Sequence, residues 1–128
     1  MDIEHVALNV PDPVGMAEWY GKHLGLRVLR KLDAAPFTHF LGDTSGRTVL
    51  ELYHHTKATI PDYKSFDPLV VHVAYKVADV AAERARLLAA GATAAGEIVT
   101  TDNGDVMTFL RDPWGLTVQL VKRLKALL

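Results

Sequence analysis

The chain has 128 residues, of which 49% are hydrophobic and 23% charged, and its formal net charge is −1. This length and composition predict one folded domain with its own core, and the near-neutral charge argues against a nucleic-acid binder. Because the sequence contains no cysteine, disulfides and thiolate metal sites are excluded, and any metal must be held by nitrogen and oxygen ligands.

The first predicted element is a strand over residues 3–10, where two kinds of side chain alternate strictly. The aliphatic face consists of Val6, Leu8 and Val10. The other face carries Ile3, His5, Ala7 and Asn9. A helix is expected next, because Asp12 is a typical N-cap and Pro13 suits the first helical position. Its buried face recurs every four residues at Met16, Tyr20 and Leu24, and Gly25 is a plausible stop. Three strands are then expected at 26–32, 38–41 and 48–53.

The second half repeats this order after a joint at residues 61–68. The segment 72–79 aligns with 5–12, residues 109–112 align with 40–43, and residues 116–120 align with 48–52. A second helix is expected between Asp79 and Gly91, followed by strands at 93–99, 106–110 and 116–121. The repeat predicts an α+β fold of two βαβββ modules, 1–60 and 67–123, which form a partial barrel and together one domain over 1–123.

Four polar residues occupy equivalent places in the two modules. His5 and His72 lie on the first strands, and Glu51 and Gln119 on the last. Each has aliphatic neighbours on the opposite strand face, which is the natural helix-packing face, so we expect all four to face a shared cavity. A carboxylate in a cavity is costly unless it is paired or bound to metal. Two imidazoles, one carboxylate and one amide oxygen suit a single Zn²⁺, Ni²⁺, Mn²⁺, Fe²⁺ or Co²⁺ ion and leave coordination positions open.

These residues carry a resemblance that covers nearly the whole chain. The motif segments are Ile3-Glu4-His5-Val6-Ala7-Leu8, Trp19-Tyr20 with Leu24-Gly25-Leu26, Leu50-Glu51-Leu52, His72-Val73-Ala74, and Asp112-Pro113-Trp114-Gly115 with Val118-Gln119-Leu120. Together they resemble the vicinal oxygen chelate superfamily, which includes glyoxalase I, methylmalonyl-CoA epimerase, extradiol dioxygenases, and fosfomycin and bleomycin resistance proteins. The resemblance implies metal ligands at His5, Glu51, His72 and Gln119, and a homodimer. Whether one chain or two would build the metal site stays open.

The resemblance implies a metal-dependent lyase, isomerase or epimerase that stabilises an enolate or oxyanion of a small oxygenated substrate. Glyoxalase I relatives usually have a glutamate where this chain has Gln119, and an amide cannot act as a general base. Glu51 is therefore the candidate catalytic base. Two alternatives remain: an Fe²⁺ extradiol-type dioxygenase, favoured by the set of two histidines and one carboxylate, and a non-catalytic protein that binds a small molecule such as an antibiotic.

Further residues are candidates for lining a substrate pocket, by strand parity or by their place in a turn: Asn9, His39, Tyr53, His55 and Trp114. For His39, exposure to solvent is as good an interpretation as lining a pocket. For Trp114, covering an edge of the core is a better interpretation than contacting a substrate. The loop 54–68 and the turn 100–105 differ most between the modules, so we expect them to shape specificity. No arginine is evident on a cavity face, which weighs against substrates with phosphate, carboxylate or coenzyme A groups.

The beginning of the chain has neither the basic region nor the apolar run of a signal peptide. No stretch reaches the ~20 apolar residues of a membrane span. The basic residues Lys122, Arg123 and Lys125 are interpreted as a solvated tail rather than a phosphate site. We therefore expect a cytoplasmic protein whose partners are a small-molecule substrate and a second copy of itself, without nucleic acid or membrane.

Overall fold

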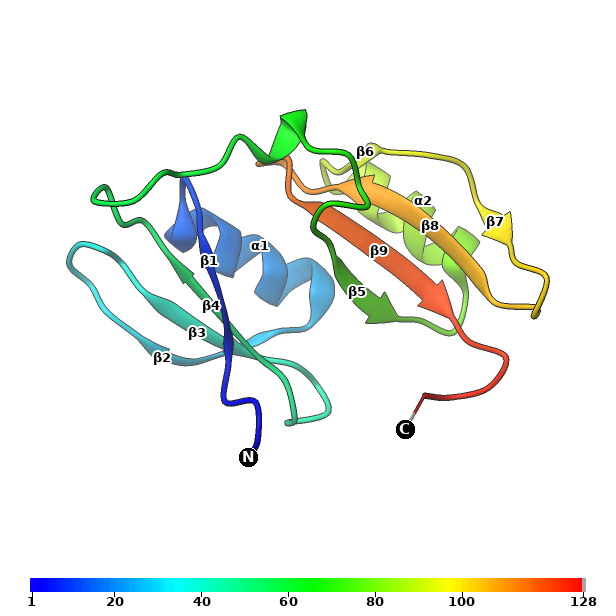
Figure 1. The fold of residues 1–128 in the computed structure, drawn as a ribbon, viewed down its shortest axis with the longest axis horizontal. Helices are drawn as coiled ribbons and strands as arrows, with labels where there is room; N and C mark the ends of the chain where they lie inside the picture. The colour runs from blue at the N-terminus through cyan, green and yellow to red at the C-terminus, as the bar shows by residue number, and fades with distance from the viewer. Residues whose placement is uncertain (128) are drawn as a thin grey trace. The chain divides into compact units, whose positions relative to one another are not determined.

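The structure is a computed structural model that describes residues 1–127 and consists of two compact units. The first unit is Met1–Pro61, and the second begins at Asp62. Each unit combines a β-sheet with a helix that lies against it (Figure 1). The predicted α+β class is confirmed.

The first unit follows the expected βαβββ order. Its elements are β1 (Val6–Asn9), α1 (Pro13–Leu24), β2 (Arg27–Lys31), β3 (His39–Gly42) and β4 (Val49–Tyr53). The sheet order is β1-β4-β3-β2, with β1 parallel to β4 and the other pairs antiparallel. The predicted helix ends are confirmed, because the Asp12 side chain accepts a hydrogen bond from the backbone N–H of Gly15 and Gly25 adopts a left-handed conformation with φ of 73°.

The core of the first unit lies between α1 and the sheet. Met16 and Tyr20 of α1 are fully buried, and the sheet supplies Leu41, Leu50 and Leu52 to the same core. These leucines share one face of β3 and β4, because Leu41 pairs with Leu50 and neighbouring strand residues alternate between faces. The other face of this sheet is therefore left for polar residues.

The second unit repeats the pattern with one interruption. Its elements are η1 (Tyr63–Ser65), β5 (Val73–Lys76), α2 (Val80–Ala89), β6 (Thr93–Ala94), β7 (Val99–Thr100), β8 (Val106–Arg111) and β9 (Thr117–Lys122). The sheet order is β5-β9-β8-β6, and β7 also pairs with β8. The strand expected over 93–99 is thus divided into β6 and β7. Between them Gly96 has φ of 150°, a backbone conformation outside the range of an ordinary strand residue.

The core of the second unit lies between α2 and strands β8 and β9. Val80 and Leu87 of α2 are buried together with Leu110, Val118 and Leu120. The Asp79 side chain caps α2 by accepting a hydrogen bond from the backbone N–H of Ala82 at 3.0 Å. Within residues 1–127, no helix combines the length and the apolar character that crossing a bilayer requires.

Candidate functional site

The sheet face of the first unit that points away from α1 carries a row of residues that includes a carboxylate and a guanidinium group. The strand register places Ala7 beside Glu51, Glu51 beside Phe40, and Phe40 beside Arg30. Partners in register share a face, so these four lie on the face opposite the leucine core. We call this surface the open face of the first unit. Arg30 reaches it because a bulge between Val28 and Arg30 shifts the register of β2, although Arg30 is exposed.

His5 and Glu51 meet on this open face. The Nε2 atom of His5 lies 3.2 Å from Oε2 of Glu51, and its Nδ1 atom hydrogen-bonds with the carboxylate of Glu4. The His5 ring also contacts Phe40 edge-on, with ring centroids 5.8 Å apart and an interplanar angle of 82°. One ring nitrogen is thus held by Glu4, and the other points at a second carboxylate.

The charges around His5 favour its protonated form when no cation is bound. The hydrogen bond with Glu4 raises the pKa of His5; burial opposes the rise, and the negative charges of Glu4 and Glu51 add to it. A divalent cation bound at Nε2 of His5 would take the place of a proton on that nitrogen and would be attracted by the same carboxylates. The electrostatics of the pair therefore suit a cation.

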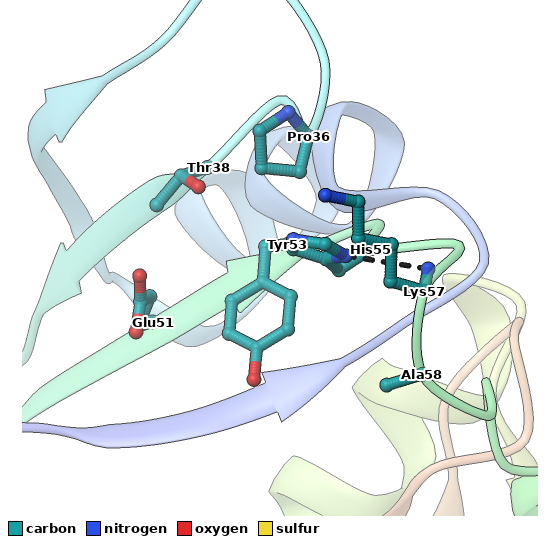
Figure 2. Close-up of a pocket in the computed structure, with 7 residues that line it drawn as sticks. All are labelled: Pro36, Thr38, Glu51, Tyr53, His55, Lys57 and Ala58. Carbon is teal, nitrogen blue, oxygen red and sulfur yellow. Dashed lines mark hydrogen bonds between the residues drawn. The ribbon is translucent and has the colours of Figure 1, made fainter.

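Beside Glu51, the first unit is hollowed to a volume of about 340 Å³, and Figure 2 shows the residues around this hollow. They are Pro36, Thr38, Glu51, Tyr53, His55, Lys57 and Ala58. Tyr53 and His55 had been expected to line a pocket, and both are here. Lys57 had not been expected, because a loop beyond a strand end has no parity from which to infer its direction.

Asn9 supports this hollow without lining it. Its side-chain oxygen accepts a hydrogen bond from the backbone N–H of His55 at 2.8 Å. Its side-chain nitrogen donates to the backbone oxygens of His55 at 3.0 Å and Thr59 at 3.2 Å. Asn9 therefore fixes the loop after β4, and we assign it that role in place of a substrate hydrogen bond.

His39 does not join the open face. It pairs with Leu52, so its side chain belongs to the face that α1 covers, and only 6% of the residue is exposed. Its Nδ1 atom lies 2.7 Å from the backbone oxygen of Phe37. The structure thus places His39 in neither of the two expected environments, pocket or solvent. His39 shares its face of β3 with Leu41, which belongs to the core, so its strand parity is regular but the face is the one packed against α1.

The second unit holds an equivalent arrangement around His72. The strand register aligns Ala74, Gln119 and Phe109 in one row. The His72 ring contacts Phe109 edge-on at 5.3 Å between centroids, and its Nδ1 atom lies 2.9 Å from the backbone oxygen of Pro68. If Nδ1 carries the proton that this hydrogen bond requires, Nε2 holds the lone pair that a metal uses. The same histidine–phenylalanine contact thus occurs in both units.

Gln119 is buried, and its amide nitrogen lies 3.5 Å from the sulfur of Met107, to which it donates. The amide oxygen is the acceptor of this group and its potential metal ligand. Trp114 lies in the turn between β8 and β9, half-buried, with its backbone N–H bound to the carboxylate of Asp112. Within residues 1–127, no three His, Asp or Glu side chains gather closely enough to hold a metal ion.

Sequence reasoning missed Arg111, which anchors the segment before His72. Its guanidinium donates hydrogen bonds to the backbone oxygens of Tyr63 at 3.0 Å and Phe66 at 2.6 Å. Further bonds reach the backbone oxygen of Gly115 and the hydroxyl of Thr117. The one available signal was that the first module has Gly42 at the equivalent position, so this arginine is specific to the second module.

Comparisons with known proteins agree with this architecture. The family model of the Glyoxalase/Bleomycin resistance protein/Dioxygenase superfamily matches residues 2–120. A glyoxalase family protein from Enterococcus faecalis is 27% identical with a TM-score of 0.72, over 94% of this chain and 97% of that one. A glyoxalase family protein from Bacillus cereus is 19% identical with a TM-score of 0.74, over 98% and 94% of the two chains. TnmS3, an antibiotic binding protein from Streptomyces sp. CB03234, is 20% identical with a TM-score of 0.68, over 95% and 98%. No curated protein matches the chain.

Proposed function

This chain belongs to the Glyoxalase/Bleomycin resistance protein/Dioxygenase superfamily, and on that premise we propose that it is a divalent-metal-dependent lyase, isomerase or epimerase. Its substrate would be a small oxygenated molecule. The observation that carries the proposal is the pair of His5 and Glu51, whose Nε2 and Oε2 atoms lie 3.2 Å apart on the open face of the first unit.

The donor atoms of the proposed residues suit a divalent cation. Metal-binding histidines usually engage their other ring nitrogen with a carboxylate or a backbone carbonyl. His5 does so with Glu4, and His72 with Pro68. We propose His5, Glu51, His72 and Gln119 as the four ligands, two from each module. Nitrogen and oxygen donors in this ratio suit Zn²⁺, Ni²⁺, Mn²⁺, Fe²⁺ or Co²⁺. When bound, the metal would supply Lewis-acid stabilisation of negative charge that develops on a substrate oxygen.

The proton chemistry would fall to Glu51. It is the carboxylate that lines the hollow, and its side chain is 17% exposed, so a bound substrate can reach it. Gln119, at the equivalent place in the second unit, has an amide that cannot accept and release a proton near neutral pH. Glu51 would therefore remove a proton from a carbon beside a carbonyl group, and Gln119 would act only as a neutral ligand.

Replacing Glu51 with Gln tests this role. The wild-type protein, loaded with metal, should exchange hydrogen for deuterium at the carbon beside the carbonyl in a panel of small keto acids, hydroxy ketones and thioesters. The E51Q variant, measured at saturating metal, should lose about 10²–10⁴-fold of that rate, the usual contribution of a general base. Glu97→Gln, an exposed carboxylate of the second unit, serves as the control and should keep full activity. Full activity in E51Q would disprove the proton-transfer role.

A second candidate function is binding without catalysis, because the structure of TnmS3, an antibiotic binding protein, resembles this chain and the hollow has the size of a small-molecule site. Protein purified without a histidine tag that neither contains nor takes up divalent metal would favour this candidate. Oxygen uptake by Fe²⁺-loaded protein with catechols would instead assign the dioxygenase alternative. The homodimer and the cytoplasmic location stay predictions.

A further inference from the structure

The chemistry of the hollow in the first unit changes from one end to the other. Glu51 and Tyr53 project from β4 on the same face, and His55 and Lys57 follow in the loop beyond the strand (Figure 2). Same-face neighbours on a strand are about 7 Å apart. The hollow therefore has the Glu51 carboxylate on its strand side, and the loop beyond the strand forms a rim that carries the Lys57 ammonium group.

The rim is held in place by hydrogen bonds. Asn9 binds His55 through its backbone N–H and its backbone oxygen, as described above. The backbone N–H of His54 donates to Pro36 at 2.8 Å, and the His54 ring nitrogen Nδ1 lies 2.9 Å from the backbone oxygen of Val10. Because β1, the segment before β3 and the loop after β4 are joined in this way, the position of the rim is set before any ligand arrives.

The groups on this rim are hydrogen-bond donors. The backbone N–H of Lys57 donates to Nδ1 of His55 at 3.3 Å, so a neutral His55 ring carries its proton on Nε2. Figure 2 shows the Lys57 side chain extended past the His55 ring toward Pro36. Among the residues that the structure describes, no carboxylate forms an ion pair with Lys57. The hydroxyls of Thr38 and Tyr53 also line the hollow and can donate.

We propose that this hollow binds a substrate whose distal end is an anionic group, a carboxylate or a phosphate, held by Lys57 and His55. The oxygen-bearing reacting end of the substrate would then lie at Glu51. This inference rests on the proposed function, because it takes Glu51 as the reacting end. The volume of about 340 Å³ limits the substrate to a small molecule with a chain of a few carbons between its two ends.

Three hydroxamates of matched length test the inference by calorimetry on Zn²⁺-loaded protein. They share an oxygen-chelating head and differ at the distal end: hexanohydroxamate is neutral, adipic acid monohydroxamate carries a carboxylate, and 5-phosphonopentanohydroxamate carries a phosphonate. We expect at least one anionic probe to bind the wild type 10-fold or more tightly than hexanohydroxamate. Whichever anionic probe binds better identifies the class of the distal group.

The Lys57→Met variant should reduce this advantage to less than 2-fold and leave the affinity for hexanohydroxamate unchanged. Lys22→Met, an exposed lysine in the last turn of α1, is the matched control and should keep the full advantage. Equal affinity of the three probes for the wild type would overturn the inference and leave the metal site intact. Failure of all three to bind would instead count against the proposed function.

A metal-free arm separates these outcomes further. Adipate added to protein without metal should shift the backbone amide NMR signals of residues 53–58 in the wild type, and the K57M variant should not show these shifts. This experiment needs no metal. Adipate-induced shifts in the wild type, together with no binding of the hydroxamates, would therefore support the anion-binding site at Lys57 and His55 and contradict the proposed metal site. Absence of the shifts in the wild type would overturn the inference.

Discussion

The two units place a histidine in nearly the same surroundings and then pair it with different chemistry. In the first unit, His5 lies edge-on to Phe40 and beside the carboxylate of Glu51. In the second, His72 lies edge-on to Phe109, and the register row of Phe109 holds the amide of Gln119. Glu51 is half-buried and lines a hollow, whereas Gln119 is buried against Met107. Under the proposed function, the duplicated framework would keep its ligand positions while restricting proton transfer to the first unit.

The two units also differ in the segment beside the sheet that side chains hold in place. In the first unit, Asn9 and Pro36 fix the loop that follows β4, and that loop carries the hollow. In the second unit, Arg111 fixes the segment that precedes β5, and that segment carries Pro68, the partner of His72. Each unit therefore stabilises a different segment beside its sheet, and neither set of contacts involves the helix–sheet core.

The largest effect that we expect comes from the equivalent hairpin turns. Gly115 of the second unit has φ of 96°, and a Cβ there would lie 2.2 Å from Cγ of Lys64 and 3.0 Å from its backbone nitrogen. Gly115→Ala should therefore combine backbone strain with displacement of η1 and cost about 2–4 kcal/mol of unfolding free energy, measured by urea denaturation.

Gly46, in the corresponding turn of the first unit, is the matched control. Its φ is 71°, and a Cβ there would meet no atom within 4 Å. Gly46→Ala should cost only the strain of the left-handed backbone, about 1–2 kcal/mol. Equal losses in the two variants would show that Gly115 is required for its backbone conformation alone and that η1 does not press on the turn.

The second prediction gives Gln119 the carboxylate of its counterpart. Within residues 1–127, the side chain of Gln119 has Met107 and no cation as its hydrogen-bond partner, so Gln119→Glu should destabilise the metal-free protein by about 1–3 kcal/mol at neutral pH. Added Zn²⁺ should restore the melting temperature if residue 119 is a ligand, and the variant should then bind Zn²⁺ more tightly than the wild type.

Melting curves with and without Zn²⁺ measure both effects. Gln119→Leu, which has no ligand atom, is the control: it should tolerate burial, and Zn²⁺ should raise its melting temperature less than that of the wild type, because three ligands remain. A Q119E variant whose melting temperature ignores Zn²⁺ would remove residue 119 from the ligand set, and the comparison of the units would then reduce to His5, Glu51 and His72.

How much the sequence predicted depends on the kind of element that carries each residue. Strand parity on β1 and β4 indicated that His5 and Glu51 share a face, and the structure brings them together, because neither strand has an irregularity in its register. The bulge in β2 places Arg30 on the open face, which no parity pattern indicated. Parity did hold for His39, which shares a face with Leu41, but that face packs against α1 and does not line the pocket. The period of a strand identifies a face only where the pairing is regular.

Two further residues were beyond the reach of any periodic pattern. Lys57 lies in a loop whose course depends on the hydrogen bonds of Asn9, a residue 48 positions earlier in the chain. Arg111 binds the backbone oxygens of Tyr63 in η1 and of Phe66 just after it, contacts between residues more than 40 positions apart in the chain. Helix caps and hydrophobic periodicity depend on neighbouring residues, so they could be predicted from the sequence. These two contacts join residues far apart in the chain and could not.

The smallest effect that we expect concerns the pKa values of two aspartates, one in a turn of each unit. Asp105, before β8, receives a hydrogen bond from the Arg123 guanidinium at 2.6 Å, and this bond lowers the pKa of Asp105. Asp43, after β3, has its pKa lowered by Ser45 and by the backbone N–H groups of its own turn, although burial opposes the effect. Because the pKa of each carboxylate is lowered by folding, the ionised group stabilises the fold at pH values above its ordinary pKa of 3.8. This stabilisation is lost as the pH falls through the lowered pKa.

Arg123→Met should therefore raise the pKa of Asp105 toward its ordinary value and leave that of Asp43 unchanged, whereas Ser45→Ala should do the reverse. Carboxyl ¹³C NMR titrations of both variants from pH 6 to pH 2 measure the two values separately. Salt should weaken the Asp105–Arg123 pair more than the Asp43 turn, because Asp43 depends on neutral donors rather than on a charged partner. If Asp105 titrates unchanged in R123M, the bond from the backbone N–H of Leu124 is sufficient to hold it, and the two turns stabilise their aspartates in the same way.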